Sequence, residues 1–228
     1  MNNEKLLKMV PIDFGGGCSL SKADLMFGLI KKYSIKESID IGVYRGRSLL
    51  PQALAHKLHT GGIVYGVDPY DNDLVGENDN AELKEQIADF IKNNDFDKIY
   101  IDVIKLLDDT GLSKNATIVR KTSSDAIEYF QNNQLRPRLI HIDGNHDTAI
   151  VMEDVSNYLK ILGENGFIVM DDVSWSSVKP ASDLLESRGL FLVFTKVNSA
   201  NDYAVYTNIK SRLAKKLLAG KLFDYGQY

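Results

Sequence analysis

The sequence predicts an α/β fold in which a mostly parallel sheet carries helices on both faces. Short apolar runs of strand length alternate along the chain with longer segments whose apolar residues recur at helical spacing. This alternation is typical of parallel strands joined by right-handed helical crossovers. The runs expected as strands are 37–41, 63–67, 116–120, 138–142, 166–170, 190–196 and 203–207.

Helices are expected between these strands, and only the last connection is too short to hold one. Residues 197–202 join the last two strands, which predicts a hairpin and therefore an antiparallel last strand. Ser21 can cap the first helix, and the glycines at 61 and 62 can end the second. The expected helices are 21–33, 47–59, 123–132, 147–162 and 179–188.

The composition is that of a globular protein and argues against several classes of partner. Of the 228 residues, 44% are hydrophobic and 25% are charged, and the net charge is −4. We therefore expect neither a nucleic acid nor a membrane as partner. A small-molecule substrate and a homo-oligomer are both compatible with this composition. Cys18 is the single cysteine and the N-terminus lacks the apolar core of a signal peptide, which predicts a cytoplasmic protein.

We expect residues 1–228 to form one domain. Three segments of this domain do not follow the alternation of strands and helices. Residues 1–34 hold the first helix and a glycine-rich loop, 15–17, expected as a mobile lid. Residues 70–115 form an insertion after the second strand, with an acidic loop followed by two helical patterns. This insertion either covers one edge of the site or is a longer surface crossover with no role. Residues 208–228 are expected as a C-terminal helix and tail.

Polar residues follow most of the predicted strands at their carboxyl ends, where ligands bind in open α/β sheets. Four of the five strand ends concerned carry a carboxylate, which packing alone does not predict. The residues at these ends are Asp40 with Gly42, Asp68, Ser123 with Ser124, Asp143, and Asp171 with Asp172.

The turn after the first strand, Asp40–Gly46, has features of a nucleotide-binding turn. Glycines at 42 and 46 let the backbone pass close to a ligand, but their spacing differs from the G-x-G-x-x-G of dinucleotide sites. Asp68 ends the second strand, 22 residues after Gly46. A carboxylate there can accept hydrogen bonds from the two hydroxyls of a ribose. The two features together indicate an adenosine ligand.

The segments SIDIGVYRGRSLL, GVDPY, LIHIDGNHD and IVMDD resemble those of the class I S-adenosylmethionine-dependent methyltransferases. The resemblance covers roughly residues 35–175, and it is greatest to the macrocin-type sugar O-methyltransferases and their relatives from antibiotic pathways. It implies a Rossmann-like fold with a seven-stranded sheet. It also implies that S-adenosylmethionine lies across the first three strand ends.

The same resemblance assigns the parts of the cofactor to residues. Gly42 and Gly46 would face its methionine, Asp68 its ribose, and Ser123 and Ser124 the edge of its adenine. The residues expected to bind the cofactor are Asp40, Gly42, Val43, Tyr44, Gly46, Ser48, Asp68, Ser123, Ser124 and Asp143.

Asp143, Asp171 and Asp172 form a candidate metal site. If the fourth and fifth strands are neighbours, their ends lie about 5 Å apart, and three carboxylates there would repel one another without a cation. Oxygen ligands suit Mg²⁺ or another hard divalent ion. In macrocin-type enzymes an Asp followed 28 residues later by Asp-Asp holds the metal, and this spacing separates Asp143 from Asp171. Alternatively, Asp171 or Asp172 only caps the next turn.

His146, three residues after Asp143, is the candidate catalytic base. A neutral hydroxyl is a poor nucleophile toward a sulfonium methyl group, so its proton must be removed or its pKa lowered. Histidine titrates near neutral pH, and in macrocin-type relatives a histidine at this position is the proposed base. Asn145 stands where some sugar methyltransferases have an Asp proposed as base. Alternatively, His146 only braces the loop.

These features together predict a metal-assisted, S-adenosylmethionine-dependent O-methyltransferase of a small molecule. The resemblance makes the acceptor a sugar or a glycosylated natural product. One alternative is a catechol-type O-methyltransferase, whose last metal ligand is an amide where this chain has Asp172. Another is a non-catalytic partner subunit that binds S-adenosylmethionine. The intact acid set argues against the latter, because a dead enzyme has no need of mutually repelling carboxylates.

Overall fold

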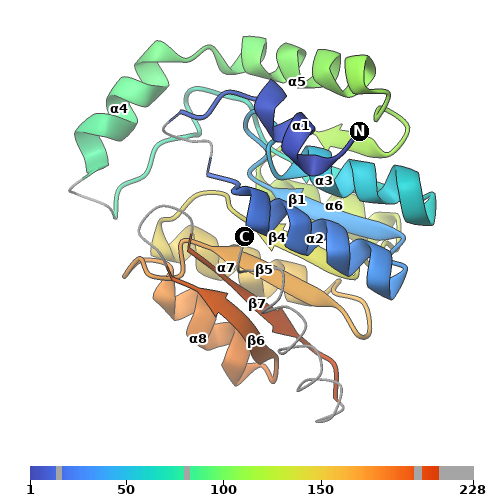
Figure 1. Cartoon of the computed structure of the whole chain (residues 1–228). Coiled ribbons are helices and arrows are strands. Elements are labelled where there is room, and N and C mark those ends of the chain that lie inside the picture. Colours follow the sequence, from blue (N-terminus) through green and yellow to red (C-terminus); the bar gives the residue numbers. More distant parts are fainter. Residues whose placement is uncertain (14–16, 80–82, 198–201, 211–228) are drawn as a thin grey trace.

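The computed structural model describes residues 1–13, 17–79, 83–197 and 202–210. Its centre is a seven-stranded sheet in the order β3-β2-β1-β4-β5-β7-β6 (Figure 1). Strand β7 is antiparallel to both β5 and β6, while the remaining pairs are parallel. The predicted fold class is therefore confirmed. The strands are β1 (Glu37–Ile41), β2 (Ile63–Val67), β3 (Ala116–Val119), β4 (Leu139–Ile142), β5 (Phe167–Asp171), β6 (Phe191–Lys196) and β7 (Tyr203–Thr207).

Helices cover both faces of this sheet (Figure 1). Helices α6, α7 and α8 pack on one face, and α2 and α3 pack on the other, where α1 and α5 join them. The helices are α1 (Asn3–Met9), α2 (Leu20–Tyr33), α3 (Leu49–Ala55), a π-helix (His56–Thr60), α4 (Lys84–Asn93), α5 (Phe96–Thr110), α6 (Ser123–Asn132), α7 (Thr148–Leu159) and α8 (Lys179–Ser187).

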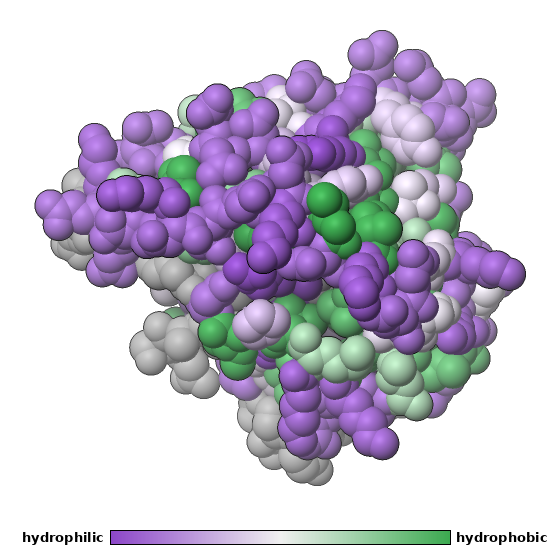
Figure 2. Space-filling view, turned by 90° about the horizontal axis from the view of Figure 1, so that it is seen from above, coloured by the Kyte–Doolittle hydropathy of each residue, from purple (hydrophilic) through white to green (hydrophobic). Residues whose placement is uncertain are grey.

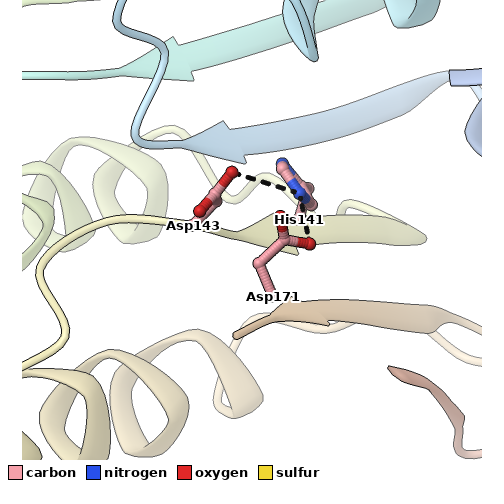
Figure 3. Close-up of side chains that lie close together, drawn as sticks. All are labelled: His141, Asp143 and Asp171. Carbon is pink, nitrogen blue, oxygen red and sulfur yellow. Dashed lines mark hydrogen bonds and ion pairs between the residues drawn. The ribbon is translucent and has the colours of Figure 1, made fainter. Parts of the chain in front are cut away.

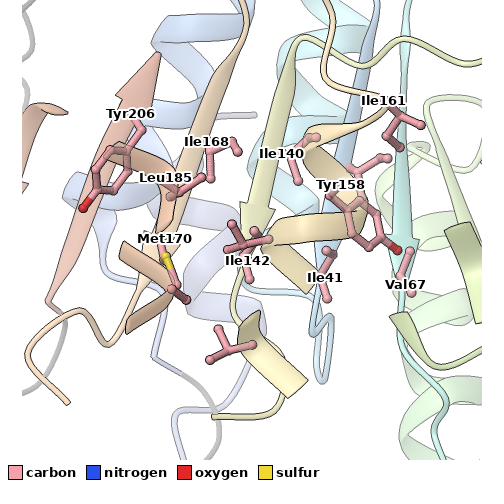
Figure 4. Packing of buried hydrophobic residues seen from close by; sticks show 14 of the residues in the cluster. Ile41, Val67, Ile140, Ile142, Tyr158, Ile161, Ile168, Met170, Leu185 and Tyr206 are labelled. Carbon is pink, nitrogen blue, oxygen red and sulfur yellow. The ribbon is translucent and has the colours of Figure 1, made fainter. Parts of the chain in front are cut away.

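The largest apolar core lies between the sheet and helices α6 to α8 (Figure 4). Every second residue of the central strands points into it, among them Ile140 and Ile142 of β4 and Ile168 and Met170 of β5. Burying one such side chain stabilises the fold by about 1.5–3 kcal/mol. The alternate residues of the same strands, such as Leu139, face α2 instead. This alternation decides which polar residues meet at the site.

Helix α5 of the insertion is amphipathic. Its buried face consists of Phe96, Ile99, Val103 and Leu107, which pack against α3 and its neighbours. Seen from the side of α5, the surface of the molecule is mainly hydrophilic (Figure 2). Helix α5 is therefore part of the folded body, and α3 and its neighbours cover its apolar face.

Several element boundaries differ from the predicted ones, each for a local reason. Helix α1 is not predicted, and it is only seven residues long. Helix α2 is capped by Ser19 in place of Ser21, because the Ser19 hydroxyl accepts the N–H of Lys22. The second predicted helix begins late, at Leu49, and continues as a π-helix up to Gly61, whose φ is 61°.

Parts of two predicted segments lie outside the described residues. These are residues 14–16, which include most of the glycine-rich loop, and the tail from residue 211 onward. Among the helices that are described, none combines the length and apolar character needed to cross a bilayer.

Candidate active site

A cavity of about 580 Å³ lies at the carboxyl ends of β1, β2, β4 and β5. Its walls come from the turn after β1, the insertion, the loop after β4 and the segment after β5. Most of the site residues predicted from the sequence meet there. Those that line it are Gly42, Val43, Tyr44, Ser48, Asp68, Ser123, Ser124, Asp143, His146, Asp171 and Asp172.

Asp40 and Gly46 differ from the prediction, because they do not line the cavity. The Asp40 side chain is fully buried, and it accepts a hydrogen bond of 2.8 Å from the hydroxyl of Ser48. Gly46 has a φ of 87°, and a Cβ placed on it would lie 3.8 Å from Leu50. Glycine is needed there for the backbone conformation. Both residues therefore shape the turn from beneath and are not placed to contact a ligand.

Gly42 brings the end of β1 against the loop after β4. Its φ is 82°, and a Cβ built on it would lie 1.8 Å from the carbonyl oxygen of Asp143. Its N–H donates to the carbonyl of Val67 at 2.9 Å. Only glycine fits between these backbones, and the close approach places the turn after β1 directly beside Asp143.

Asp68 ties the turn to the end of β2. Its Oδ2 accepts the N–H of Tyr44 and its Oδ1 accepts the N–H of Tyr70, both at 2.8 Å. Burial raises the pKa of Asp68, and these backbone N–H groups act in the opposite direction. Each carboxylate oxygen has a second lone pair, so Asp68 can also accept a hydroxyl that enters the cavity.

Asp154 of α7 lines the cavity beside Ser123, and no sequence motif indicates a role for it. Its side chain is 1% exposed, and neither carboxyl oxygen has a hydrogen-bond partner within the described ranges. Burial raises the pKa of Asp154 to about 7, although the Ser123 hydroxyl acts to lower it. An unpaired buried carboxyl group is costly, and a polar group of a ligand in the cavity could pair with it.

We expect Asp154 to make the unliganded protein less stable as pH rises. The pKa of Asp154 is raised in the fold from 3.8 to about 7, so the folded state holds the proton more tightly than the unfolded chain. Stability is therefore lost as pH rises from about 4 to 7, by at most about 1.4 kcal/mol per pH unit. Thermal denaturation of Asp154→Asn should lack this loss of stability between pH 4 and 7, whereas Glu128→Gln, at an exposed carboxylate of α6, should retain it. Parallel pH profiles for Asp154→Asn and the wild type would contradict the expectation.

A row of buried charged residues crosses the sheet beneath the cavity, on the face toward α2. Asp40 and His141 are register partners on β1 and β4, and Asp171 ends β5. His141 Nδ1 lies 2.6 Å from an oxygen of Asp40, and its Nε2 lies 3.2 Å from an oxygen of Asp171. Figure 3 shows His141 on β4, with dashed lines that join it to Asp143 and to Asp171.

The row holds two positive charges among its carboxylates. Burial alone would lower the pKa of His141, but Asp171 and Asp40 raise it to about 10, so both ring nitrogens carry protons. Lys22 of α2 is fully buried. Its Nζ donates to Asp171 Oδ2 and lies 3.7 Å from Asp143 Oδ2. The inner part of the acidic site is therefore already paired with cations of the protein.

A second group faces the cavity and consists of Asp143, His146, Asp172 and Glu77. His146 Nδ1 lies 2.7 Å from Glu77 Oε1. His146 Nε2 lies 3.0 Å from Asp172 Oδ2 and 3.8 Å from Asp143 Oδ1, but neither contact has hydrogen-bond geometry. The ring of Trp175 packs against His146 with centroids 4.8 Å apart. Glu77 thus orients the ring. Burial alone would lower the pKa of His146, but Asp143, Asp172 and Glu77 raise it well above its usual value.

The adjacent residues Asp171 and Asp172 belong to different groups, contrary to the prediction of one three-carboxylate metal site. Among the described residues, two sets have ligand atoms close enough to hold a metal ion. One is His141, Asp143 and Asp171, and the other is Asp143, His146 and Asp172. Asp171 ends β5 pointing toward α2, whereas Asp172 has a left-handed φ of 50° that turns its side chain the other way.

The insertion is bound to the loop after β4. Asp147 accepts the backbone N–H groups of Asn78 and Asp79, each at 2.7 Å. Asn145 donates to the carbonyl of Gly76 at 2.9 Å, and the N–H of His146 donates to Glu77 at 3.1 Å. The loop at 76–79 therefore lies against the candidate base.

Four residues of the site have no signal strong enough to predict a role from sequence. Three are Lys22, Glu77 and Asp154. The fourth is Arg47, whose buried guanidinium donates to the carbonyls of Leu7, Val10 and Cys18. Only Lys22 leaves a trace in the sequence. It stands four residues before Met26 and seven before Leu29, so it is a charged residue on the apolar face of a helix.

Solved structures of low sequence identity share this fold. An O-methyltransferase from Bacillus cereus, solved in complex with SAH, matches with a TM-score of 0.65 and 14% identity, over 91% of this chain and 90% of that one. An O-methyltransferase of tomaymycin synthesis from Streptomyces achromogenes, in complex with SAM, matches with a TM-score of 0.62 and 12% identity, over 92% and 100%. A putative caffeoyl-CoA O-methyltransferase from Staphylococcus aureus has a TM-score of 0.59 and 15% identity, over 91% and 93%.

The sequence itself identifies the family. No curated protein matches the chain significantly. A family model described as "Methyltransferase domain" matches residues 39–173, which is more than half of the chain. The matched segment runs from β1 to just beyond β5 and contains the turn after β1, Asp143 and the Asp171–Asp172 pair. The chain therefore belongs to this methyltransferase domain family.

Proposed function

We propose that the protein is an S-adenosylmethionine-dependent O-methyltransferase that methylates a hydroxyl of a small molecule. The observation that carries this proposal is the composition of one cavity, which joins the turn at Gly42 and Asp68 to the acidic group at Asp143, His146 and Asp172. The family match supports methyl transfer, and two structures of the same fold contain SAM or SAH.

The cofactor would lie along the carboxyl ends of β1, β2 and β3. The glycine at 42 leaves room for its methionine part, and Asp68 accepts its ribose hydroxyls. Ser123, Ser124 and the unpaired Asp154 offer polar groups to the adenine. This arrangement would direct the sulfonium toward Asp143, because Gly42 and Asp143 are in contact.

The residues present fit a hard divalent cation at the outer acidic group. Asp143 and Asp172 supply carboxylate oxygens, and the nearby His146 Nε2 has no hydrogen-bond partner within the described ranges. We propose that Asp143 and Asp172 hold the ion, Mg²⁺ or a similar metal. When bound there, it would lower the pKa of an acceptor hydroxyl. Asp171 is left out of this set because Lys22 and His141 already pair with it.

His146 accepts the proton of the acceptor hydroxyl in this proposal. The hydroxyl oxygen forms a bond to the methyl carbon while the sulfur–methyl bond breaks, and the sulfonium becomes a thioether. Glu77 keeps a proton on Nδ1. A cation held by Asp143 and Asp172 would offset the carboxylate charges that raise the pKa of His146, so that Nε2 could act as base, as in a catalytic triad. The wall formed by Trp175 and the loop at 76–79 would limit the access of water.

The acceptor is proposed to be a sugar or a glycosylated natural product with neighbouring hydroxyls. The cavity lining includes Asn145, Ser174 and Asp202 beside Trp175. These polar groups offer hydrogen bonds, as a polyol requires, and the indole offers an apolar surface. The apolar side chains of the insertion that also line the cavity, such as Leu74 and Phe90, would suit the non-sugar part of a glycosylated product.

Calorimetry and turnover assays test the proposal in separable steps. S-adenosylhomocysteine should bind with a Kd of about 1–100 µM, and failure to bind would refute the function as a whole. Methyl transfer from labelled S-adenosylmethionine should then be measured with vicinal-diol sugars and with catechols, each with EDTA or with added Mg²⁺. Binding without transfer to any acceptor would indicate a non-catalytic subunit. Transfer that EDTA leaves unchanged would refute only the metal part.

A further inference from the structure

Lys22 is a buried ion-pair partner that the proposed chemistry does not use. It lies in the first turn of α2, and its side chain is 0% exposed. Its ammonium group donates to Asp171, 149 residues away in the sequence. Lysine is rarely buried completely, because removing an ammonium group from water is costly unless it is paired.

The surroundings of Lys22 are those of a bound cation. Its Nζ contacts Asp171 Oδ2 and lies 3.7 Å from Asp143 Oδ2. Asp143 and Asp171 are also the carboxylates of the inner group that could otherwise hold a metal ion. Two carboxylates at neighbouring strand ends repel each other unless a positive charge lies between them, and Lys22 supplies this charge from α2.

We propose that Lys22 is a built-in cation that fills the inner half of the acidic site, so that only the outer half, formed by Asp143 and Asp172, is open to a metal ion. The residue acts through the carboxylates and does not line the cavity, so it is a positioning residue. The statement about the outer half rests on the proposed function. The neutralisation of Asp171 by Lys22 does not depend on it.

Through Lys22, the N-terminal segment contributes a charge to the acidic site. Helix α2 begins at the Ser19 cap, and the preceding carbonyl of Cys18 is held by the buried Arg47 of the turn after β1. Lys22 reaches the end of β5 from this anchored start. The segment thus connects the turn after β1 to the acidic group, and its attachment fixes where the cationic charge lies.

Manganese binding to the full-length protein tests the inference without any assay of activity. Mn²⁺ affinity, measured by electron paramagnetic resonance, should rise at least about tenfold in Lys22→Met, because the place of the ammonium group between Asp171 and Asp143 becomes open to the metal ion. In the double variant Lys22→Met/Asp171→Asn it should return to within about threefold of the wild type. Lys31→Met, at an exposed lysine of the same helix, is the matched control and should change nothing.

The double variant can still test the inference if Lys22→Met alone fails to fold. Because it lacks both partners of the ion pair, neither charge is left unpaired. The double variant should therefore fold and should recover most of the melting temperature that the single variant loses. If Asp171 is itself a metal ligand, the double variant will lose Mn²⁺ affinity at least about tenfold, and the inference is overturned. It is also overturned if folded Lys22→Met binds Mn²⁺ no better than the wild type. If Lys22→Met binds Mn²⁺ and the wild type does not, the role of Lys22 as a built-in cation is supported and the metal part of the proposed function is refuted.

Discussion

Replacement of His146 by alanine is expected to lower kcat by a factor of about 10²–10⁴, the usual contribution of a general base. The affinities for S-adenosylhomocysteine and for Mn²⁺ should stay within about threefold of the wild type. The physical reason is the position of Nε2, which lies beside Asp143 and Asp172 without a hydrogen bond, while Glu77 occupies Nδ1. Single-turnover kinetics with saturating cofactor and acceptor would measure the loss directly.

Two further variants distinguish a base at His146 from a metal ligand or a loop brace. Glu77→Gln should give a smaller loss of kcat, because the ring keeps its place but loses the carboxylate that fixes its proton on Nδ1. His59→Ala, at an exposed histidine outside the cavity lining, should leave kcat unchanged. If His146→Ala abolishes Mn²⁺ binding, then His146 is a metal ligand and the base must be sought elsewhere. An unchanged kcat would exclude both roles.

The fold followed from the sequence because each strand carries its own signal. The predicted runs at β1, β2 and β7 match the strands to the residue, since short runs with apolar residues on the buried face have little freedom of register. The glycines at 42 and 61 marked their turns because both adopt a positive φ. Such local rules need no knowledge of distant contacts.

The geometry of the acidic group could not be predicted in this way. The sequence places Asp171 and Asp172 side by side, but strand alternation sends the first toward α2, and the left-handed φ of the second turns it toward His146. The partners also come from far away along the chain. Lys22 belongs to the first long helix and Glu77 to a loop without periodicity, so that no spacing rule connects them to Asp143.

The replacement of Gly42 by alanine is expected to be the most damaging single change in the turn after β1. A Cβ there would lie 1.8 Å from the carbonyl oxygen of Asp143, 2.5 Å from its carbonyl carbon and 3.0 Å from the Cα of Gly144. All three atoms are backbone, so no side chain can move aside, and β1 and β4 would have to separate. We expect a loss of more than about 4 kcal/mol in the free energy of unfolding.

Gly189→Ala is the matched control for this change, because Gly189 has a φ of 86° and a Cβ added to it would meet nothing within 4 Å. It should reveal the cost of the positive φ alone, about 1 kcal/mol. Thermal denaturation of both variants isolates the effect of the clash, and calorimetry with S-adenosylhomocysteine shows whether any folded Gly42→Ala retains the cofactor site. Equal melting temperatures for the two variants would mean that the strands can part at little cost. In that case the contact of the turn with Asp143 would not be a fixed feature of the fold.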